Sequence, residues 1–98
     1  MGHQMEIEWD DDKRSHNVKK HLVDFAYVAA MFKGALVETI DDRENYGEER
    51  IIALGQVDGN VYRVVYTLRD DRVRIISAME ANKHEKKDYY EQIYDGRN

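Results

Sequence analysis

The sequence contains no cysteine and no proline, and its apolar stretches are short. Without cysteine the chain can form neither a disulfide nor a zinc site with thiolate ligands. Without proline no position is obliged to interrupt a helix or to mark a domain boundary. The apolar run AYVAAMF is far shorter than the ~20 residues of a membrane-spanning helix, so we expect no membrane contact.

The net charge and the length of the chain limit the kinds of protein that this sequence can encode. The 98 residues include 20 acidic and 15 basic side chains, which gives a formal net charge of −5. This balance argues against a general nucleic-acid binder, whose affinity comes from neutralising phosphates. We expect one domain over residues 1–98, with a disordered or vector-derived start at 1–4 and a frayed end at 95–98. Residues 1–12 are acidic and lack the apolar core of a signal peptide, so the expected location is the cytoplasm.

The first third of the chain predicts a strand followed by two helices. Alternation of apolar and acidic residues in MEIEW indicates an edge strand over 5–9. Acidic residues open the next segment, 10–22, and basic residues close it, an arrangement that suits a helix dipole. Asp24 is a suitable N-cap for a helix over 25–32, and Gly34 is a suitable C′ residue to end it.

From residue 35 onward the apolar period changes to two, which predicts strands over 35–40, 50–57, 61–68 and 72–78. Asp58-Gly59 is a favoured type I′ hairpin pair. Asn82 and Glu85 form a capping-box pattern at the start of a final helix. The predicted fold class is α+β. It is an antiparallel meander with two N-terminal helices and a C-terminal helix, in the order β-α-α-β-β-β-β-α.

One predicted helix carries a polar stripe where a core-facing stripe is usual. Spacing of i, i+4, i+7 and i+8 puts four side chains on one face: Lys13, Asn17, Lys20 and His21. His21 is a candidate general acid or base, because an unperturbed imidazole titrates near pH ~6.5; the alternative is a structural cap at the helix C-terminus. His16 and His21 are five residues apart, which misses the i, i+4 spacing of a helical metal pair. We therefore expect no metal and no cofactor.

Two arginines stand in predicted apolar strands. Arg50 begins one strand, and Arg74 lies inside another. Strict alternation gives the second strand one face made of Arg72, Arg74, Ile76 and Ala78. If the strands are neighbours, Arg50 and Arg74 approach one surface, where their planar donors suit phosphate oxygens. The alternative is ion pairing with Glu6, Glu48 or Glu49.

The last predicted helix is basic and aromatic. It combines three lysines with two tyrosines: Lys83, Lys86, Lys87, Tyr89 and Tyr90. Side chains of these types contact phosphates and stack on bases in single-stranded RNA. The alternative is a solvated helix face with an aromatic packing stripe. Nothing in the residues alone decides between the two.

Several short motifs, taken in order, resemble one protein family. They are EWDDDK, then NVKKH followed by DF, then GEERII, then RIISA followed by a glutamate and YY. Together, over about residues 7–90, they resemble the BrnT toxin family. The resemblance implies a RelE/ParE-like fold, an antiparallel sheet with helices packed on it. The matching positions are Trp9, Asp10, Lys13, Asn17, Lys20, His21, Gly47, Glu48, Arg50, Arg74, Ser77, Ala78, Glu85 and Tyr89.

The resemblance implies the toxin of a type II toxin–antitoxin pair, a metal-independent endoribonuclease that inhibits translation by cleaving RNA, free or on the ribosome. It also implies a BrnA-like antitoxin that neutralises the toxin in a hetero-oligomer and that alone contacts operator DNA. On this basis Arg50 and Arg74 hold the phosphate, and His21 or Lys13 transfers the proton. Tyr89 stacks on a base or donates a proton, and substrate is held by Lys20, Lys83 and Lys87.

The chain departs from the family pattern at three positions. Met79 stands where RIISA is usually followed by arginine, Glu80 where a basic residue is common, and Leu22 where glycine often follows KH. A missing arginine beside a phosphate weakens charge stabilisation in the transition state. The alternative function is therefore a catalytically weakened toxin fold that acts mainly by binding its antitoxin. Composition alone supports a plain structural or adaptor domain.

Overall fold

The computed structural model describes residues 5–94, so the ends expected at 1–4 and 95–98 lie outside the described residues. The predicted order of elements is confirmed, as is the α+β class. The second predicted helix continues beyond its α-helical part as a 3-10 helix. The elements are β1 (Ile7–Trp9), α1 (Asp11–His21), α2 (Phe25–Val28), the 3-10 helix η1 (Ala29–Lys33), β2 (Val37–Ile40), β3 (Ile51–Val57), β4 (Asn60–Arg69), β5 (Arg72–Glu80) and α3 (Lys83–Tyr94).

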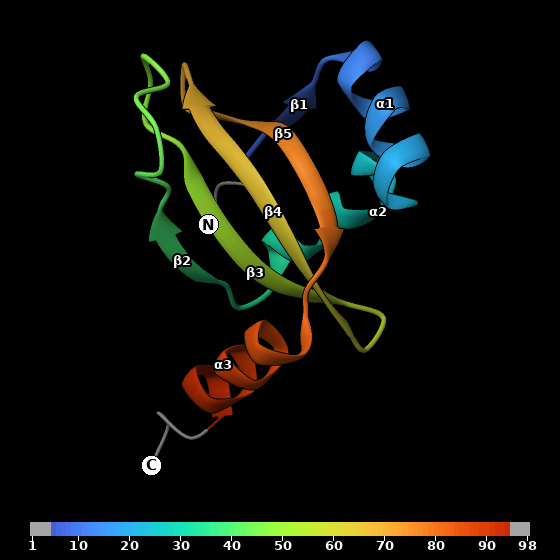
Figure 1. The fold of residues 1–98 in the computed structure, drawn as a ribbon, viewed down its shortest axis with the longest axis vertical. Helices are drawn as coiled ribbons and strands as arrows, with labels where there is room; N and C mark the ends of the chain where they lie inside the picture. Colours follow the sequence, from blue (N-terminus) through green and yellow to red (C-terminus); the bar gives the residue numbers. More distant parts are fainter. Residues whose placement is uncertain (1–4, 95–98) are drawn as a thin grey trace.

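The five strands form one sheet in the order β1-β5-β4-β3-β2 (Figure 1). Strands β2 to β5 pair with their neighbours in antiparallel fashion, which confirms the predicted meander. Strand β1 instead pairs with β5 in parallel, with Glu8 opposite Arg74, so the sheet as a whole is mixed. Only short hairpin connections oblige two strands to run antiparallel. Most of the chain separates β1 from β5, and no such constraint acts on this pair.

Asp24 caps α2 as predicted, and α1 is capped by Asp10, which was not predicted as a cap. The Asp10 carboxylate accepts a hydrogen bond from the Lys13 backbone N–H at 3.1 Å, and Asp24 accepts one from Ala26 at 2.9 Å. The expected left-handed Gly34 is not found, because its backbone is extended (φ −112°, ψ −166°). Its N–H bonds the Met31 carbonyl and closes the 3-10 turn there. A tightened last turn therefore ends this segment in place of a glycine C′ motif.

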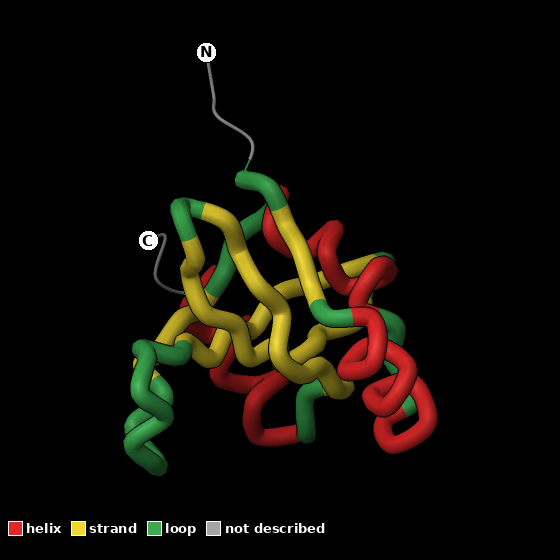
Figure 2. Tube along the Cα trace, turned by 90° about the horizontal axis from the view of Figure 1, so that it is seen from above, coloured by secondary structure: helices red, strands yellow, loops and turns green. Residues whose placement is uncertain are grey.

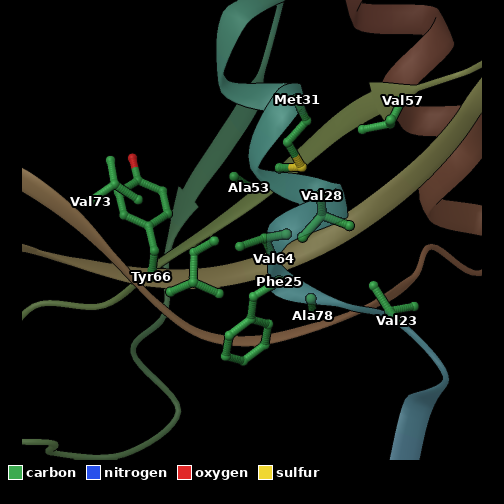
Figure 3. Close-up of a cluster of buried hydrophobic side chains, with 11 residues drawn as sticks. Val23, Phe25, Val28, Met31, Ala53, Val57, Val64, Tyr66, Val73 and Ala78 are labelled. Atoms are coloured by element: carbon green, nitrogen blue, oxygen red, sulfur yellow. The ribbon is translucent and has the colours of Figure 1, made fainter. Parts of the chain in front are cut away.

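The sheet buries a different core on each face. On one face, Phe25, Val28 and Met31 point from α2 and η1 toward strand residues such as Val64 and Ala53 (Figure 3). On the other face, α3 covers a smaller cluster made of Leu54, Val61, Ala81 and Tyr89, with Val37 and Ile93 packed against it. Seen from above, the helices lie around the curved sheet (Figure 2). Within the described residues, no helix covers β4 and β5 on the α3 side beyond the end where α3 sits (Figure 1).

A β-bulge in β5 changes which side chains share that uncovered face. Val65 pairs with Ser77 and the next residue, Tyr66, pairs with Ile75, so Ile76 is an extra residue without a partner on β4. The strict alternation predicted for this strand is therefore wrong after residue 75. Ala78 turns into the first core, and Ser77 takes the face of Arg74.

Asn17 joins α1 to the edge of β5 beyond the point where β1 stops. Its Nδ2 donates to the Val23 carbonyl at 2.9 Å and to the Ala78 carbonyl at 2.8 Å. Its Oδ1 accepts from the Ala78 N–H at 3.1 Å. The side chain therefore serves the strand edge as a neighbouring strand would, and only 5% of Asn17 is exposed.

The two tight hairpins use different residues for the same backbone geometry. Asp58 and Gly59 have φ values of 51° and 81°, which confirms the predicted type I′ turn. Asp70 and Asp71 connect β4 to β5 with φ values of 51° and 63°. Aspartate tolerates this left-handed region better than most residues but less well than glycine.

Replacing Asn17 by alanine should lower the free energy of unfolding by about 2–4 kcal/mol, because it leaves three buried backbone groups without a partner. Urea denaturation followed by circular dichroism measures this change. Asn45→Ala is the matched control, since it removes one exposed turn bond, from the Gly47 N–H. Equal losses in the two variants would contradict the role given to Asn17.

Replacing Asp71 by glycine should raise the free energy of unfolding by up to about 1 kcal/mol, because glycine adopts positive φ without strain. Thermal unfolding measures the shift. Asp42→Gly is the control, since Asp42 does not have a positive φ and the same change there should only add freedom to the unfolded chain. A lower melting temperature for Asp71→Gly would show that the turn is not strained.

Candidate functional site

The polar stripe of α1 faces the bulged part of β5. Lys13, Lys20 and His21 come together around a cavity of about 170 Å³ whose opposite wall is formed by Ile76 and Ser77. His16 and Asn17 complete the lining. Because Asn17 is anchored on Ala78, the helix cannot slide along the strand without breaking its buried hydrogen bonds. The predicted stripe is therefore fixed at this cavity.

Arg74 lies on the uncovered sheet face beside β1. Its Nη1 is 2.9 Å from Oε2 of Glu8, and the Nε of Arg72 is 2.6 Å from the other carboxylate oxygen. Hydrogen bonds from Arg72 and Arg74 hold the pKa of Glu8 below its usual range. Glu8 is thus shared by two guanidinium groups, and Nη2 of Arg72 also lies 3.7 Å from Oδ2 of Asp70. Two arginines and two carboxylates therefore meet at this edge of the sheet. The alternative of ion pairing is present, but the partner of Arg74 is Glu8, which was not among the glutamates expected.

Arg50 approaches the same face from two strands away. It immediately precedes Ile51, which pairs with Tyr66, so the continued register sets Arg50 opposite Thr67. Thr67 in turn pairs with Arg74. Two strand spacings put the Cα atoms of the two arginines about 10 Å apart, within reach of two extended side chains. The structure therefore brings Arg50 and Arg74 to one surface.

The side chain of Arg50 is held by the acidic loop before β3. Its Nε is 3.3 Å from Glu48, and its guanidinium carbon lies 4.1 Å from the centre of the Tyr46 ring. Tyr46 itself donates to Asp41, whose carboxylate also binds Arg43 through two contacts of 2.7 Å. The Arg43 guanidinium holds the pKa of the Asp41 carboxyl well below its usual range. This network orders the loop, and the loop positions Arg50.

Three predicted site residues lie apart from this surface. Tyr89 is only 3% exposed, and its hydroxyl donates to the Ala35 carbonyl at 3.0 Å. Its burial raises the pKa of the hydroxyl. Tyr89 can neither stack on a base nor reach a phosphate there, so its place is in the core under α3. Lys83 and Lys87 are exposed, and helical spacing puts them on the side of α3 opposite the sheet-facing Glu85 and Tyr89.

Other residues of this face were not predicted as site residues. Arg72 was placed on the face but given no role, and Glu8 was missed because its partners are remote in sequence, with Glu8 and Arg74 separated by 66 positions. Arg63 stands in the apolar run VYRVVY, a pattern like the one that marked Arg74, and it pairs directly with Met79. A guanidinium therefore lies beside the position where the family pattern would put one.

The described part of the chain shows neither a cluster of metal ligands nor a membrane-spanning helix. Between residues 5 and 94, no group of three or more histidine, cysteine, aspartate or glutamate side chains is arranged to hold a metal ion. Over the same range, no helix is long and apolar enough to cross a membrane.

The sequence and the fold of this chain are similar to those of known proteins. Residues 9–85 match the model of a family described as the ribonuclease toxin BrnT of a type II toxin–antitoxin system. Among solved structures, the Brucella abortus ribonuclease toxin BrnT is similar, with 25% sequence identity and a TM-score of 0.62. The likeness covers 82% of this chain and 100% of the Brucella chain. No curated protein sequence matches.

Replacing Glu8 by glutamine should strengthen phosphate binding several-fold, because Arg72 and Arg74 lose their competing carboxylate. Titration of the amide resonances of β5 with inorganic phosphate measures the affinity. Glu44→Gln is the control, since it removes the same charge from an exposed part of the loop. If the affinity is unchanged in Glu8→Gln while thermal unfolding is preserved, Arg74 is not an anion site.

Proposed function

The chain belongs to the BrnT family of ribonuclease toxins of type II toxin–antitoxin systems, and on this premise we propose that it stops translation by cleaving RNA. The cut is a transfer within the RNA. The 2′-hydroxyl attacks the adjacent phosphate, the 5′-oxygen leaves, and a cyclic phosphate and a free 5′-hydroxyl result. The nucleophile belongs to the substrate, so the protein must position the phosphate, move protons and stabilise negative charge.

One observation carries the proposal: Ser77 borders both groups of candidate residues. It lines the cavity that holds Lys13, Lys20 and His21. Through the bulge, it also shares the sheet face of Arg74. A phosphate bound over Ser77 would have guanidinium donors on one side and proton-transfer groups on the other. RNA cleavage needs this arrangement, because arginines must stabilise the charge on the phosphate while a neighbouring group moves the proton of the 2′-hydroxyl.

The proposed roles follow the placement of each side chain. Arg74, with Arg50 from across the sheet, holds the phosphate oxygens. His21 or Lys13 is the proton-transfer group: its neutral form takes the proton from the 2′-hydroxyl, and its protonated form then gives a proton to the leaving 5′-oxygen. Lys20 contacts the RNA backbone beside them. Tyr89, Lys83 and Lys87 are left out, because one is buried and two face away from the sheet.

Family membership implies an antitoxin partner. We propose a BrnA-like antitoxin that covers the site and that alone contacts operator DNA. The net charge of −5 fits a protein that spends much of its time in such a complex and binds RNA through a local surface.

The second candidate is a catalytically weakened toxin that acts mainly through its partner, and Met79 favours it. Arg63 is paired directly with Met79, but its Nε lies 3.1 Å from Glu85 on α3, so its guanidinium does not replace the missing arginine at the phosphate. Growth after induction without the antitoxin separates the two, since an active toxin arrests growth and a weakened one does not. Met79→Arg should increase the arrest only in the second case.

Replacing Arg74 by alanine should slow RNA cleavage by roughly 10²–10³-fold, because one donor to the developing charge is lost. The assay follows cleavage of an mRNA by the purified protein, with and without ribosomes. Lys83→Ala is the control, since it removes one positive charge from the far side of α3 and should cleave at close to the normal rate. An unchanged rate in Arg74→Ala would remove Arg74 from the mechanism.

A further inference from the structure

A second hollow lies next to the proposed phosphate site, between the sheet and α3. Its volume is about 220 Å³. Ile52 and Leu54 give it an apolar wall, and Arg63, Asp88 and Gln92 project polar groups into its lining. Apolar walls with a few convergent polar groups suit a flat ring that also carries hydrogen-bonding atoms.

The side chain of Arg63 is fixed in this hollow by one ion pair, and its other N–H groups remain available as hydrogen-bond donors. Its side chain is 16% exposed, and its Nε is 3.1 Å from Oε2 of Glu85. The other oxygen of Glu85 accepts the Asn82 N–H of the capping box at 2.9 Å, so Glu85 is occupied at both ends. Among the described residues, the two terminal nitrogens of Arg63 have no hydrogen-bonding partner. They are free to bind a pair of acceptor atoms.

The α3 side of the hollow offers acceptors. Asp88 has a side chain that is 45% exposed, and Oδ2 is 3.4 Å from the exposed His84. Glu85 and Asp88 make this side acidic, in contrast to the arginines beside β1. A phosphate would be repelled here. A neutral group that presents N–H donors would be attracted, because a carboxylate accepts two parallel hydrogen bonds.

We propose that this hollow binds a guanine base of the RNA, which makes it the specificity pocket of the proposed ribonuclease and rests on that function. Guanine carries two neighbouring acceptors, O6 and N7, which suit the fork of Arg63. On its Watson–Crick edge it carries the N1 and N2 donors, which suit Asp88. Adenine offers N7 beside a donor, so it would set its N6 amino group against the guanidinium.

The position of the pocket agrees with this assignment. Arg63 and Val65 lie on the same face of β4, two residues and about 7 Å apart. Val65 pairs with Ser77, over which the phosphate is proposed to sit. One ribose can bridge this distance, so the base in the pocket would be attached to the nucleotide at the cleavage site.

Cleavage of short RNAs tests the pocket. Oligonucleotides that differ only in one base, guanine, inosine or adenine, should be cut next to guanine about ten- to a hundredfold faster than next to adenine. Inosine lacks the N2 amino group, so it should lose part of this preference. In Asp88→Asn the difference between guanine and inosine should disappear. In Glu91→Gln, which removes the same charge from the same helix outside the pocket, it should persist.

Binding of mononucleotides tests the pocket without cleavage. The normal protein should bind guanosine 3′-monophosphate more tightly than adenosine 3′-monophosphate in an NMR titration. Asp88→Asn should reduce this preference without abolishing it, because Arg63 still distinguishes O6 of guanine from the N6 amino group of adenine. Cleavage without a base preference would overturn the pocket and leave the ribonuclease standing. Selective guanine binding without any cleavage would keep the pocket and overturn the ribonuclease. If neither guanine preference nor cleavage is observed, both proposals are wrong.

Discussion

The buried amide of Asn17 is the contact on which the candidate site depends. It replaces a missing strand at the edge of β5, satisfies both backbone groups of Ala78, and ties α1 to the sheet at one register. Without this contact, nothing would hold Lys13, Lys20 and His21 at one place on the sheet. A buried hydrogen-bonding group with no spare partner allows one arrangement only. The same contact therefore fixes the helix and its distance to the phosphate face.

The uncovered face of the sheet has two different halves. At the β1 edge, two guanidinium groups gather, with Arg72 and Arg74 sharing Glu8 and Arg72 also contacting Asp70. Toward α3, Arg63 is matched by Glu85, and Asp88 adds a second carboxylate at the hollow. A polynucleotide offers the same alternation, with charged phosphates followed by neutral bases. The two halves of the face thus suit different parts of one ligand, although the protein as a whole is acidic.

Features that depend on a few neighbouring residues could be predicted from the sequence. The helix cap at Asp24, the capping box of Asn82 and Glu85, the Asp58-Gly59 turn and the strand periods are local, and the structure has them. Features set by remote contacts could not. The bulge at Ile76 reverses the alternation of β5, the parallel pairing of β1 follows no short connection, and the burial of Tyr89 depends on a carbonyl 54 positions away. Several motif residues, such as Asn17 and Glu85, turn out to hold the fold as well as mark the family.

The contact between Asn17 and Ala78 also has a consequence for the order of synthesis. It spans 61 positions, and the strand that receives it is the last of the sheet to be made. Such a long-range contact closes late, because the entropy of a large loop is lost before any local gain. Until β5 has left the ribosome, the polar stripe of α1 has no strand to pack against. A nascent chain whose last strand is still inside the ribosome would therefore carry an incomplete candidate site.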